Sequence, residues 1–144
     1  MQKSRECANL KVIFDTRSYV AAVISEKGVS AKALWLAHQG TIVNFYSEEI
    51  ISELQRTLKR EKFSLEKEQQ EYFINFVMDS SFLIEQDEDH KVKLCRDNSD
   101  DKFLSLAKQI EADFIITRDE DLLILKNIGK TKITTPSEFI KHFM

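Results

Sequence analysis

Strand-like apolar runs and helix-like amphipathic runs alternate along this chain of 144 residues. The strand-like runs lie at residues 10–15, 41–47, 81–85, 113–117 and 132–135. The helix-like runs lie at residues 18–25, 30–40, 47–63, 64–79, 99–112 and 136–144. Strands that are separated by helices usually pair in parallel, with helices covering both faces of the sheet. The alternation therefore predicts a three-layer α/β/α domain with a central, mostly parallel sheet of about 4–5 strands.

Local signals mark where several of these helices begin and end. Ser30 precedes an apolar run as a predicted N-cap, and Gly40 stands at the C-cap of the same helix. Pro136 occupies the first position of the last helix, where its missing N–H is tolerated. In the segment 47–63, apolar residues recur every fourth position and form one stripe: Ile50, Leu54 and Leu58. We expect this stripe to face the core.

The composition is that of a folded domain without a general attraction for polyanions. Hydrophobic residues make up 42% of the chain and charged residues 31%, and the formal net charge is −3. A length of 144 residues fits one domain, which we place at 10–144 after a short N-terminal extension at 1–9. A nucleic acid would have to bind a local basic patch, because the chain as a whole is acidic.

Cysteine usage and the length of the apolar runs indicate a cytoplasmic protein. Cys7 and Cys95 do not make a disulfide framework, which suits a reducing compartment. The first residues carry charges without the apolar run that a signal peptide needs. No segment approaches the roughly 18 apolar residues that cross a bilayer, so we expect no membrane partner.

Acidic residues stand at the carboxyl ends of two predicted strands. Asp15 closes the first strand, and Asp119 and Asp121 come just after the strand at 113–117. In open α/β sheets, sites form at the carboxyl ends of parallel strands. These positions therefore predict a site at that edge of the sheet.

A further acid stands at the start of the helix 99–112. On a wheel of about 100° per residue with Phe103 at zero, Asp100 falls at about +60°, on the margin of the buried face. Asp101 points well away from that face. Asp100 is therefore either a site residue or a capping acid that the helix dipole favours.

The helix that begins near Ser47 offers three more acids, and the wheel does not choose among them. Glu48 and Glu53 each flank the apolar stripe by about 60° on opposite edges, and Glu49 lies behind it. The spacing alone leaves the choice open.

Several carboxylates at one end of a sheet repel one another unless a cation neutralises them. Hard oxygen ligands of this kind select Mg²⁺ or Mn²⁺. Such an ion polarises a phosphoryl oxygen and activates water, so the chemistry implied is phosphodiester hydrolysis. The histidines at 38, 90 and 142 are scattered in the sequence, so no zinc site competes. The sequence also contains no Gly-rich phosphate loop.

Five segments, taken in order, resemble one known family. They are "VIFDT", "SEEIISELQRTL", "CRDNSDDKFLSLA", "ADFIITRDEDLL" and "ITTPSEFI". Together they resemble the PIN-domain family and, within it, the VapC-type ribonucleases that are the toxins of bacterial toxin–antitoxin pairs. The resemblance spans about residues 10 to 141 and implies a PIN-like fold. It also implies Mg²⁺- or Mn²⁺-dependent endoribonuclease activity on single-stranded RNA.

The resemblance also implies roles for individual residues. Catalytic carboxylates would stand at four positions: Asp15, Glu53, Asp100 and Asp119. Metal ligands would come from an overlapping set: Asp15, Asp100, Asp119 and Asp121. The choice of Glu53 among the three glutamates rests on the resemblance alone. Hydroxyls of Thr16, Ser47 and Thr117 would orient carboxylates or water, unless they are ordinary turn or cap hydroxyls.

Arg17 departs from the family pattern, in which Asn usually follows the Asp-Thr pair. At an effective dielectric of about 20, a positive charge about 5 Å from a divalent ion costs up to roughly 6–7 kcal/mol before screening. Three interpretations stay open. Arg17 contacts the scissile phosphate, or it fills the acidic pocket as an internal counter-ion, or its side chain points elsewhere. In the second case the chain would be a catalytically impaired PIN-fold RNA-binding or protein-interaction module.

Other residues are candidates for contact with RNA or with partners. Basic side chains that could reach RNA phosphates are Arg118, Lys59, Arg60 and Lys62, although a charge run at a helix end is also typical of a solvated face. Trp35 and Tyr19 could stack on bases or form a dimer contact, and core packing is the favoured interpretation of Trp35. The family resemblance further implies a homodimer formed through early helices and a cognate antitoxin protein as inhibitor.

Overall fold

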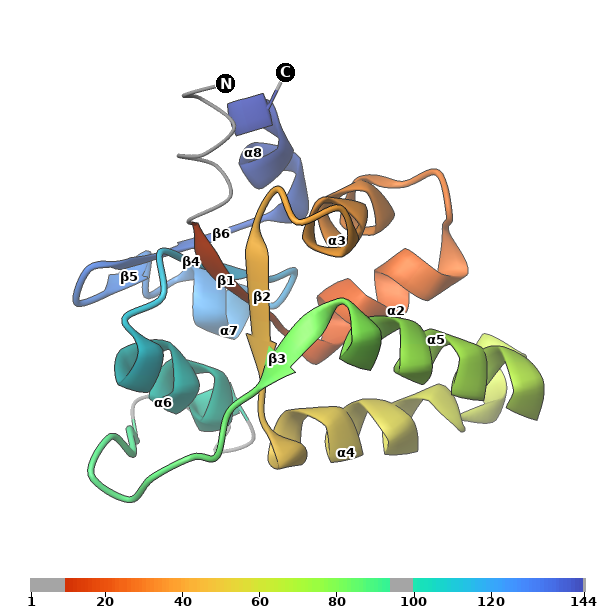
Figure 1. Ribbon diagram of the computed structural model, residues 1–144, viewed down its shortest axis with the longest axis horizontal. Helices are drawn as coiled ribbons and strands as arrows, with labels where there is room; N and C mark the ends of the chain where they lie inside the picture. Colours follow the sequence, from red (N-terminus) through yellow and green to blue (C-terminus); the bar gives the residue numbers. More distant parts are fainter. Residues whose placement is uncertain (1–9, 94–99, 144) are drawn as a thin grey trace.

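The computed structural model describes residues 10–93 and 100–143 and shows a six-stranded sheet flanked by helices (Figure 1). The strands are β1 (Lys11–Phe14), β2 (Val43–Tyr46), β3 (Ser81–Leu83), β4 (Phe114–Ile116), β5 (Asn127–Ile128) and β6 (Thr131–Thr134). They lie in the order β3-β2-β1-β4-β6-β5, and each neighbouring pair is parallel except β5 with β6. The prediction of a mostly parallel sheet is confirmed.

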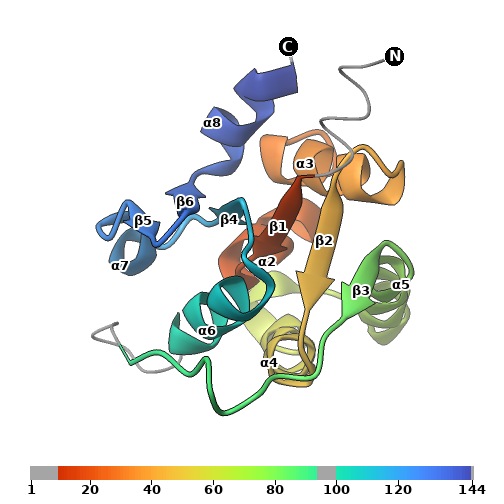
Figure 2. The ribbon, with the colours of Figure 1, turned by 60° about the vertical axis from the view of Figure 1, so that its left-hand side comes forward.

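Helices connect the strands and lie on both sides of the sheet (Figure 2). They are α2 (Thr16–Ile24), α3 (Val29–His38), α4 (Glu48–Leu58), α5 (Lys67–Asp79), α6 (Asp101–Ile110), α7 (Glu120–Leu123) and α8 (Pro136–Ile140), with 3-10 turns η1 (Glu61–Phe63) and η3 (Lys141–Phe143). Helix α2 packs against α3 and α4, while α6 packs against β1 and β4 from the other side. The predicted three-layer α/β/α arrangement is confirmed.

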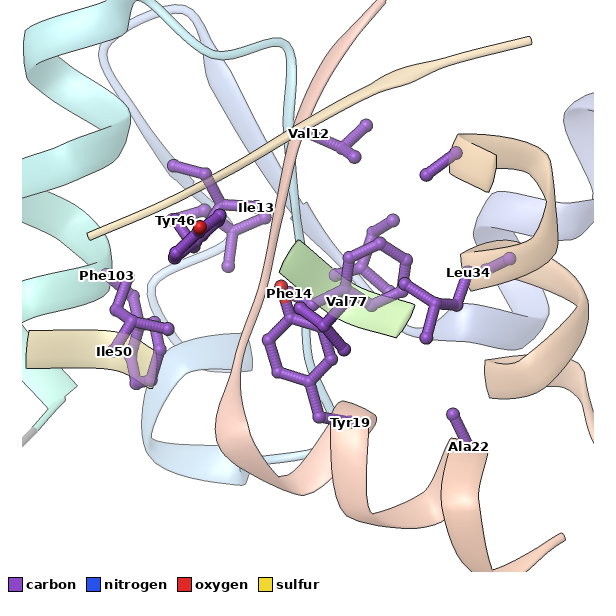
Figure 3. Close-up of a cluster of buried hydrophobic side chains, with 14 of the residues drawn as sticks. Val12, Ile13, Phe14, Tyr19, Ala22, Leu34, Tyr46, Ile50, Val77 and Phe103 are labelled. Carbon is purple, nitrogen blue, oxygen red and sulfur yellow. The ribbon is translucent and has the colours of Figure 1, made fainter. Parts of the chain in front are cut away.

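The two faces of the sheet bury different side chains, as the alternation along a strand requires. Val12 and Phe14 of β1 lie on the side of α2 and α3, whereas Ile13 lies on the side of α6 (Figure 3). All three side chains are fully buried. Ile50 from the predicted stripe of α4 and Phe103 of α6 are buried on the Ile13 side. Two apolar layers thus enclose the central strand from which the first site residue follows.

One predicted helix cap is wrong. Helix α3 begins directly after Gly28, so Ser30 lies inside its first turn and is buried instead of capping the helix. At the other end, Gly40 has a positive φ of 81° just beyond the helix, which agrees with its predicted role in ending α3.

The segment predicted as one helix at 47–63 is divided in two. Helix α4 ends at Leu58 and the 3-10 turn η1 follows. Ser64 closes that turn with a φ of 51°, in the left-handed region that a right-handed helix cannot include. For this reason the next helix, predicted from residue 64, begins only at Lys67.

The sheet has one more strand than the upper end of the predicted range. Strand β5 comprises two residues and pairs antiparallel with β6 across a turn in which Gly129 has a φ of 57°. A strand of two residues is too short to produce a visible alternation in the sequence. The short helix α7, which precedes it, was not predicted because four residues are too few to show a helical period.

The expectation that Trp35 packs in the core is wrong. Helix α3 packs against α2 and α8 through its other side, and Trp35 is 50% exposed. Its ring stacks on Phe76 with the ring centroids 6.2 Å apart. Tyr19 is instead fully buried, and its hydroxyl accepts a hydrogen bond from Asn44 Nδ2 at 2.8 Å. Tyr19 is therefore not available for base stacking or for a dimer contact.

Several predictions concern residues that the structure does not describe. The proposed N-terminal extension at 1–9 and both cysteines, Cys7 and Cys95, lie outside the described residues. Across 10–93 and 100–143, none of the helices is long and apolar enough to span a bilayer.

Candidate active site

The predicted site lies where the connections of the sheet change direction. From β1 the chain continues to β2 and β3 on one side of the sheet and then crosses over to β4, which pairs with β1 on the other side. Such a switch point opens a crevice at the carboxyl ends of the strands. Asp15 directly follows β1, and its N–H donates to the carbonyl of Ile116, the last residue of β4, at 3.1 Å. The loops after β1 and β4 are therefore held side by side.

Asp15 is buried, and two donors hold its carboxylate. Oδ1 accepts a hydrogen bond from the Ser18 N–H at 2.9 Å, which makes Asp15 the N-cap of α2, and Oδ2 accepts from the Thr117 hydroxyl at 2.5 Å. Burial raises the pKa of Asp15, the two hydrogen bonds oppose that rise, and the neighbouring charge of Asp119 adds to it. A buried acid with a perturbed pKa beside other acids is typical of a functional site.

Asp15→Asn is expected to raise the free energy of unfolding of the metal-free protein at neutral pH. Because the pKa is raised in the folded state, the folded chain binds this proton more tightly than the unfolded chain, so stability falls as pH rises above the ordinary value of 3.8. Asparagine can still accept from Ser18 but has no charge to desolvate. Urea unfolding in EDTA between about pH 4 and about pH 8 should show a gain that grows with pH. A loss of stability would contradict this expectation.

Three further aspartates place carboxylate oxygens within 4.8 Å of one another: Asp100, Asp119 and Asp121. Asp100 stands at the N-cap position of α6, and Asp119 stands at that of α7. The Asp119 Oδ1 accepts from the Asp121 N–H at 2.9 Å, which fixes the two residues relative to each other. Hard oxygen ligands at this spacing fit a divalent cation such as Mg²⁺ or Mn²⁺. We call this set the three-aspartate cluster.

Thr117 joins Asp15 to the three-aspartate cluster. Its hydroxyl donates to Asp15 Oδ2 and accepts from the Asp119 N–H at 2.9 Å, and the residue is fully buried. This geometry supports the orienting role predicted for Thr117. Ser47, by contrast, is the N-cap of α4 and accepts from the Ile50 N–H at 3.3 Å, which is the ordinary cap role that the sequence left open.

Glu53 is the glutamate of α4 that faces the site, whereas Glu48 and Glu49 are exposed in the first turn. Glu53 Oε2 accepts a hydrogen bond from the Thr16 hydroxyl, and Glu53 Oε1 lies 2.7 Å from Lys102 Nζ. Both carboxylate oxygens therefore have partners within the protein. Among the described residues, the group of acids close enough to share an ion does not include Glu53.

The comparison with known proteins decides the family. The family model of the PIN domain matches residues 11–121 of this sequence, a span that contains every acid of the site. The chain belongs to the PIN-domain family. It is also 30% identical over 149 aligned positions to an uncharacterized protein of Methanocaldococcus jannaschii, and the alignment covers 96% of this chain and 94% of that protein. PIN domains are generally metal-dependent nucleases, and the acid-rich switch point of this chain fits that activity.

This PIN domain carries a cation inside its acid site that the sequence did not reveal. The Lys102 side chain is 5% exposed, and its Nζ also lies 4.9 Å from the centroid of the Phe103 ring. On the wheel, Lys102 falls about 100° from Phe103, which suggests a position toward solvent. The position predicted from the helical wheel is wrong because the segment 84–93 covers the side of α6 that faces away from the sheet. There, the Gln86 side-chain amide donates to the Lys102 carbonyl at 3.2 Å.

The same covering corrects the prediction for Asp101. The wheel placed Asp101 well away from the buried face, but the residue is buried in the structure. A second contact from the covering segment lies one turn further along α6, where the Val92 N–H donates to the Ser105 hydroxyl at 2.9 Å. Polar residues on this side of α6 are therefore buried, although their spacing in the sequence predicts a face exposed to solvent.

Arg17 lies at the rim of the PIN-domain site. Its side chain is 68% exposed, and its Nε is 4.0 Å from Asp119 Oδ2. An exposed ion pair contributes little, about 0–1 kcal/mol. The geometry favours the interpretation in which Arg17 points to where a substrate would lie, because a side chain this exposed does not fill the acidic pocket, and the buried cation of the site is Lys102.

A groove of about 700 Å³ begins at this rim and lies between α2, the end of α4 and η1. Four of its lining residues are basic: Arg17, Arg60, Lys62 and Arg118. Thr16, which donates to Glu53, lines the same groove and links it to the acids. Lys59, also predicted as an RNA contact, lies in a separate hollow beside Gln55 and Gln70. We call the first hollow the basic groove.

Proposed function

We propose that this PIN domain is a Mg²⁺- or Mn²⁺-dependent endoribonuclease that hydrolyses phosphodiester bonds of single-stranded RNA. The observation that carries the proposal is the position of the three-aspartate cluster directly beside the basic groove. Acids alone would attract any hard cation, and basic residues alone would attract any polyanion. Together, on a nuclease fold, they suit metal-assisted cleavage of a nucleic acid.

The roles of the residues follow from their contacts. Asp100, Asp119 and Asp121 would hold the ion, with Asp15 close behind through Thr117. When bound, the ion supplies Lewis acidity toward the scissile phosphodiester. The protein itself keeps the acids in place. The donors to Asp15 and Asp119 are the backbone N–H groups of Ser18 and Asp121 at helix starts, and these donors do not have to rearrange when substrate binds.

The size and lining of the basic groove favour a single strand as substrate. A volume of about 700 Å³ is that of a small-molecule pocket and is too small to enclose a duplex. Phe63 lies on its wall and offers a surface for base stacking, while the four basic residues can follow the phosphates. Sequence-specific RNA-binding proteins also target single strands more often than helices.

Arg17→Asn is expected to weaken binding of single-stranded RNA and to lower its salt dependence. If Arg17 neutralises one phosphate, the slope of log affinity against log salt should fall by about 0.7. Fluorescence anisotropy of a labelled oligonucleotide, measured at several salt concentrations in EDTA, reports this slope without cleavage. Lys130→Asn is the matched control, because Lys130 is exposed on the β5–β6 turn and does not line the basic groove.

The cleavage assay of the same variant separates the remaining interpretations of Arg17. A phosphate contact predicts slower Mn²⁺-dependent cleavage by Arg17→Asn than by the parent. Faster cleavage by the variant would mean that Arg17 opposes metal binding. Equal binding and equal cleavage would mean that the side chain has no part in either step.

The direct test of the proposed activity is cleavage of a labelled single-stranded RNA in the presence of Mn²⁺ or Mg²⁺. We expect internal cuts that stop when EDTA removes the ion. Duplex RNA and single-stranded DNA of the same sequence serve as comparison substrates. Failure to cut any of them with either ion would sink the nuclease proposal and leave the family assignment standing.

We further propose that the chain is the toxin of a toxin–antitoxin pair and acts on cytoplasmic RNA. The exposed ring of Trp35, stacked on Phe76 and beside Tyr72, gives α3 and α5 an apolar surface that suits a homodimer formed through an early helix. Light scattering tests the dimer, for which a mass near twice 16.8 kDa is expected. Growth arrest on expression, relieved by the protein of an adjacent gene, tests the antitoxin.

A second candidate function is a PIN-fold RNA-binding or protein-interaction module without catalysis. The observation that favours it is the cationic content of the site: Lys102 is paired with Glu53, and Arg17 lies 4.0 Å from Asp119. Such a module would bind RNA equally well with and without Mn²⁺. A Mn²⁺ titration therefore discriminates between the two functions.

A further inference from the structure

Lys102 holds an ammonium group inside the acid site. Its side chain is 5% exposed, and its Nζ lies 2.7 Å from Glu53 Oε1. A lysine this deeply buried is stable as a cation only beside an anion that stays with it. Helices α4 and α6 contact each other here, so the packing of the two helices fixes the ammonium on the Glu53 side of the site.

Glu53 has no carboxylate oxygen left without a partner from the protein. Oε1 is paired with Lys102, and Oε2 accepts from the Thr16 hydroxyl. The three-aspartate cluster brings carboxylate oxygens within 4.8 Å of one another, and the Arg17 side chain that contacts it, with Nε 4.0 Å from Asp119 Oδ2, is 68% exposed. The site therefore has one anionic centre suited to a divalent ion and a second anionic centre that already contains a cation.

We propose that Lys102 takes the place of a second divalent ion in this site. Nucleases that use two metals hold them about 3.5–4 Å apart, so that both reacting oxygens are stabilised. Here the ammonium neutralises Glu53, and the chain binds a single ion at the three-aspartate cluster. The inference rests on the proposed metal-dependent nuclease function and specifies how many ions that function uses.

Lys102 is a positioning residue, because its burial keeps it from reaching an RNA phosphate without breaking the pair with Glu53. Lys102 holds one oxygen of Glu53, and the other oxygen accepts from the hydroxyl of Thr16, which lines the basic groove. The Glu53 carboxylate is thereby held in one orientation next to the expected path of the strand. Unlike a second metal ion, this positive charge cannot be removed by a chelator.

Mn²⁺ binding to the full chain, measured by electron paramagnetic resonance of the unbound ion, tests the proposal without requiring activity. The parent should bind about one ion per chain. Lys102→Met removes the charge, keeps an unbranched apolar stem and frees Glu53, so about two ions are expected. Lys102→Met/Glu53→Gln should return to about one ion, with an affinity within about threefold of the parent. Lys32→Met, at an exposed lysine of α3, is the matched control.

Each outcome decides the question. Two ions in the parent, or a single ion in a folded Lys102→Met variant, overturns the inference while RNA cleavage by the same samples keeps the nuclease proposal. Loss of the ion from the double variant identifies Glu53 as a ligand and also overturns it. If Lys102→Met does not fold, Lys102→Gln, which also removes the charge and keeps Glu53, replaces it with the same expected count of about two ions. No bound Mn²⁺ and no cleavage in the parent overturns the proposed function together with the inference.

Discussion

Asp100→Asn and Asp119→Asn are each expected to lower RNA cleavage by at least about 100-fold. Loss of a residue that merely orients a metal ligand costs about 10–100-fold in affinity or activity, and loss of a ligand should reach at least the upper end of that range. Both residues belong to the three-aspartate cluster, in which the oxygens lie within 4.8 Å of one another. Asparagine keeps the size of each side chain and one oxygen, but it removes the negative charge that attracts the ion.

The experiment compares initial rates of Mn²⁺-dependent cleavage of one labelled RNA by the parent and by both variants. Asp89→Asn is the matched control, because it makes the same chemical change at an exposed loop position. Circular dichroism and thermal melting check that the variants are folded. Full activity in folded Asp100→Asn and Asp119→Asn would show that this cluster does not carry the reaction. Partial recovery at high Mn²⁺ would instead support the assignment, since a weakened site fills at higher ion concentration.

Lys102→Met is expected to lower the free energy of unfolding by about 2–4 kcal/mol. Removing one partner of a buried ion pair typically costs about 3–5 kcal/mol, because the other charge stays buried and uncompensated. The cost here should be at the lower end, since Glu53 is 23% exposed and water can reach it in part. For a domain whose total stability is about 5–15 kcal/mol, this is a large fraction.

A double-mutant cycle separates this cost from loss of packing. Lys102→Met/Glu53→Gln should recover most of the lost stability, because it leaves no unpaired charge in the site. Urea unfolding in EDTA gives the four free energies without any contribution from metal binding. If the double variant is as unstable as Lys102→Met, the pair contributes through packing and its charges have little effect on stability.

Much of the fold could be predicted from the sequence because the sheet is mostly parallel and its central strand β1 is buried on both faces. The run at 10–15 is apolar for that reason, and the observed β1 lies within it. Asp15 and Asp119 could be assigned to the same edge of the sheet because each follows such a run, and the structure adds that the two strands are neighbours. This inference needs only the position of an acid relative to a strand end, which is a local property of the sequence.

The rest of the site could not be read locally because it depends on what covers each helix. Lys102 and Asp101 are buried by a polar segment at 84–93 whose position no periodicity indicates. The choice of Glu53 required a family resemblance, since two glutamates were equivalent on the wheel. Trp35 shows the opposite error: a large apolar side chain in a helix remained half exposed because its helix packs through the other side.

The hydrogen bond between Asp15 and Thr117 joins residues that are 102 positions apart in the chain. During translation, the first of these residues is made long before the second, and β4, the strand that brings them together, is made only after α6. A nascent chain that ends before β4 therefore has no assembled site. If the protein cuts RNA as proposed, a nascent chain translated only as far as α6 cannot yet cut the RNA that encodes it.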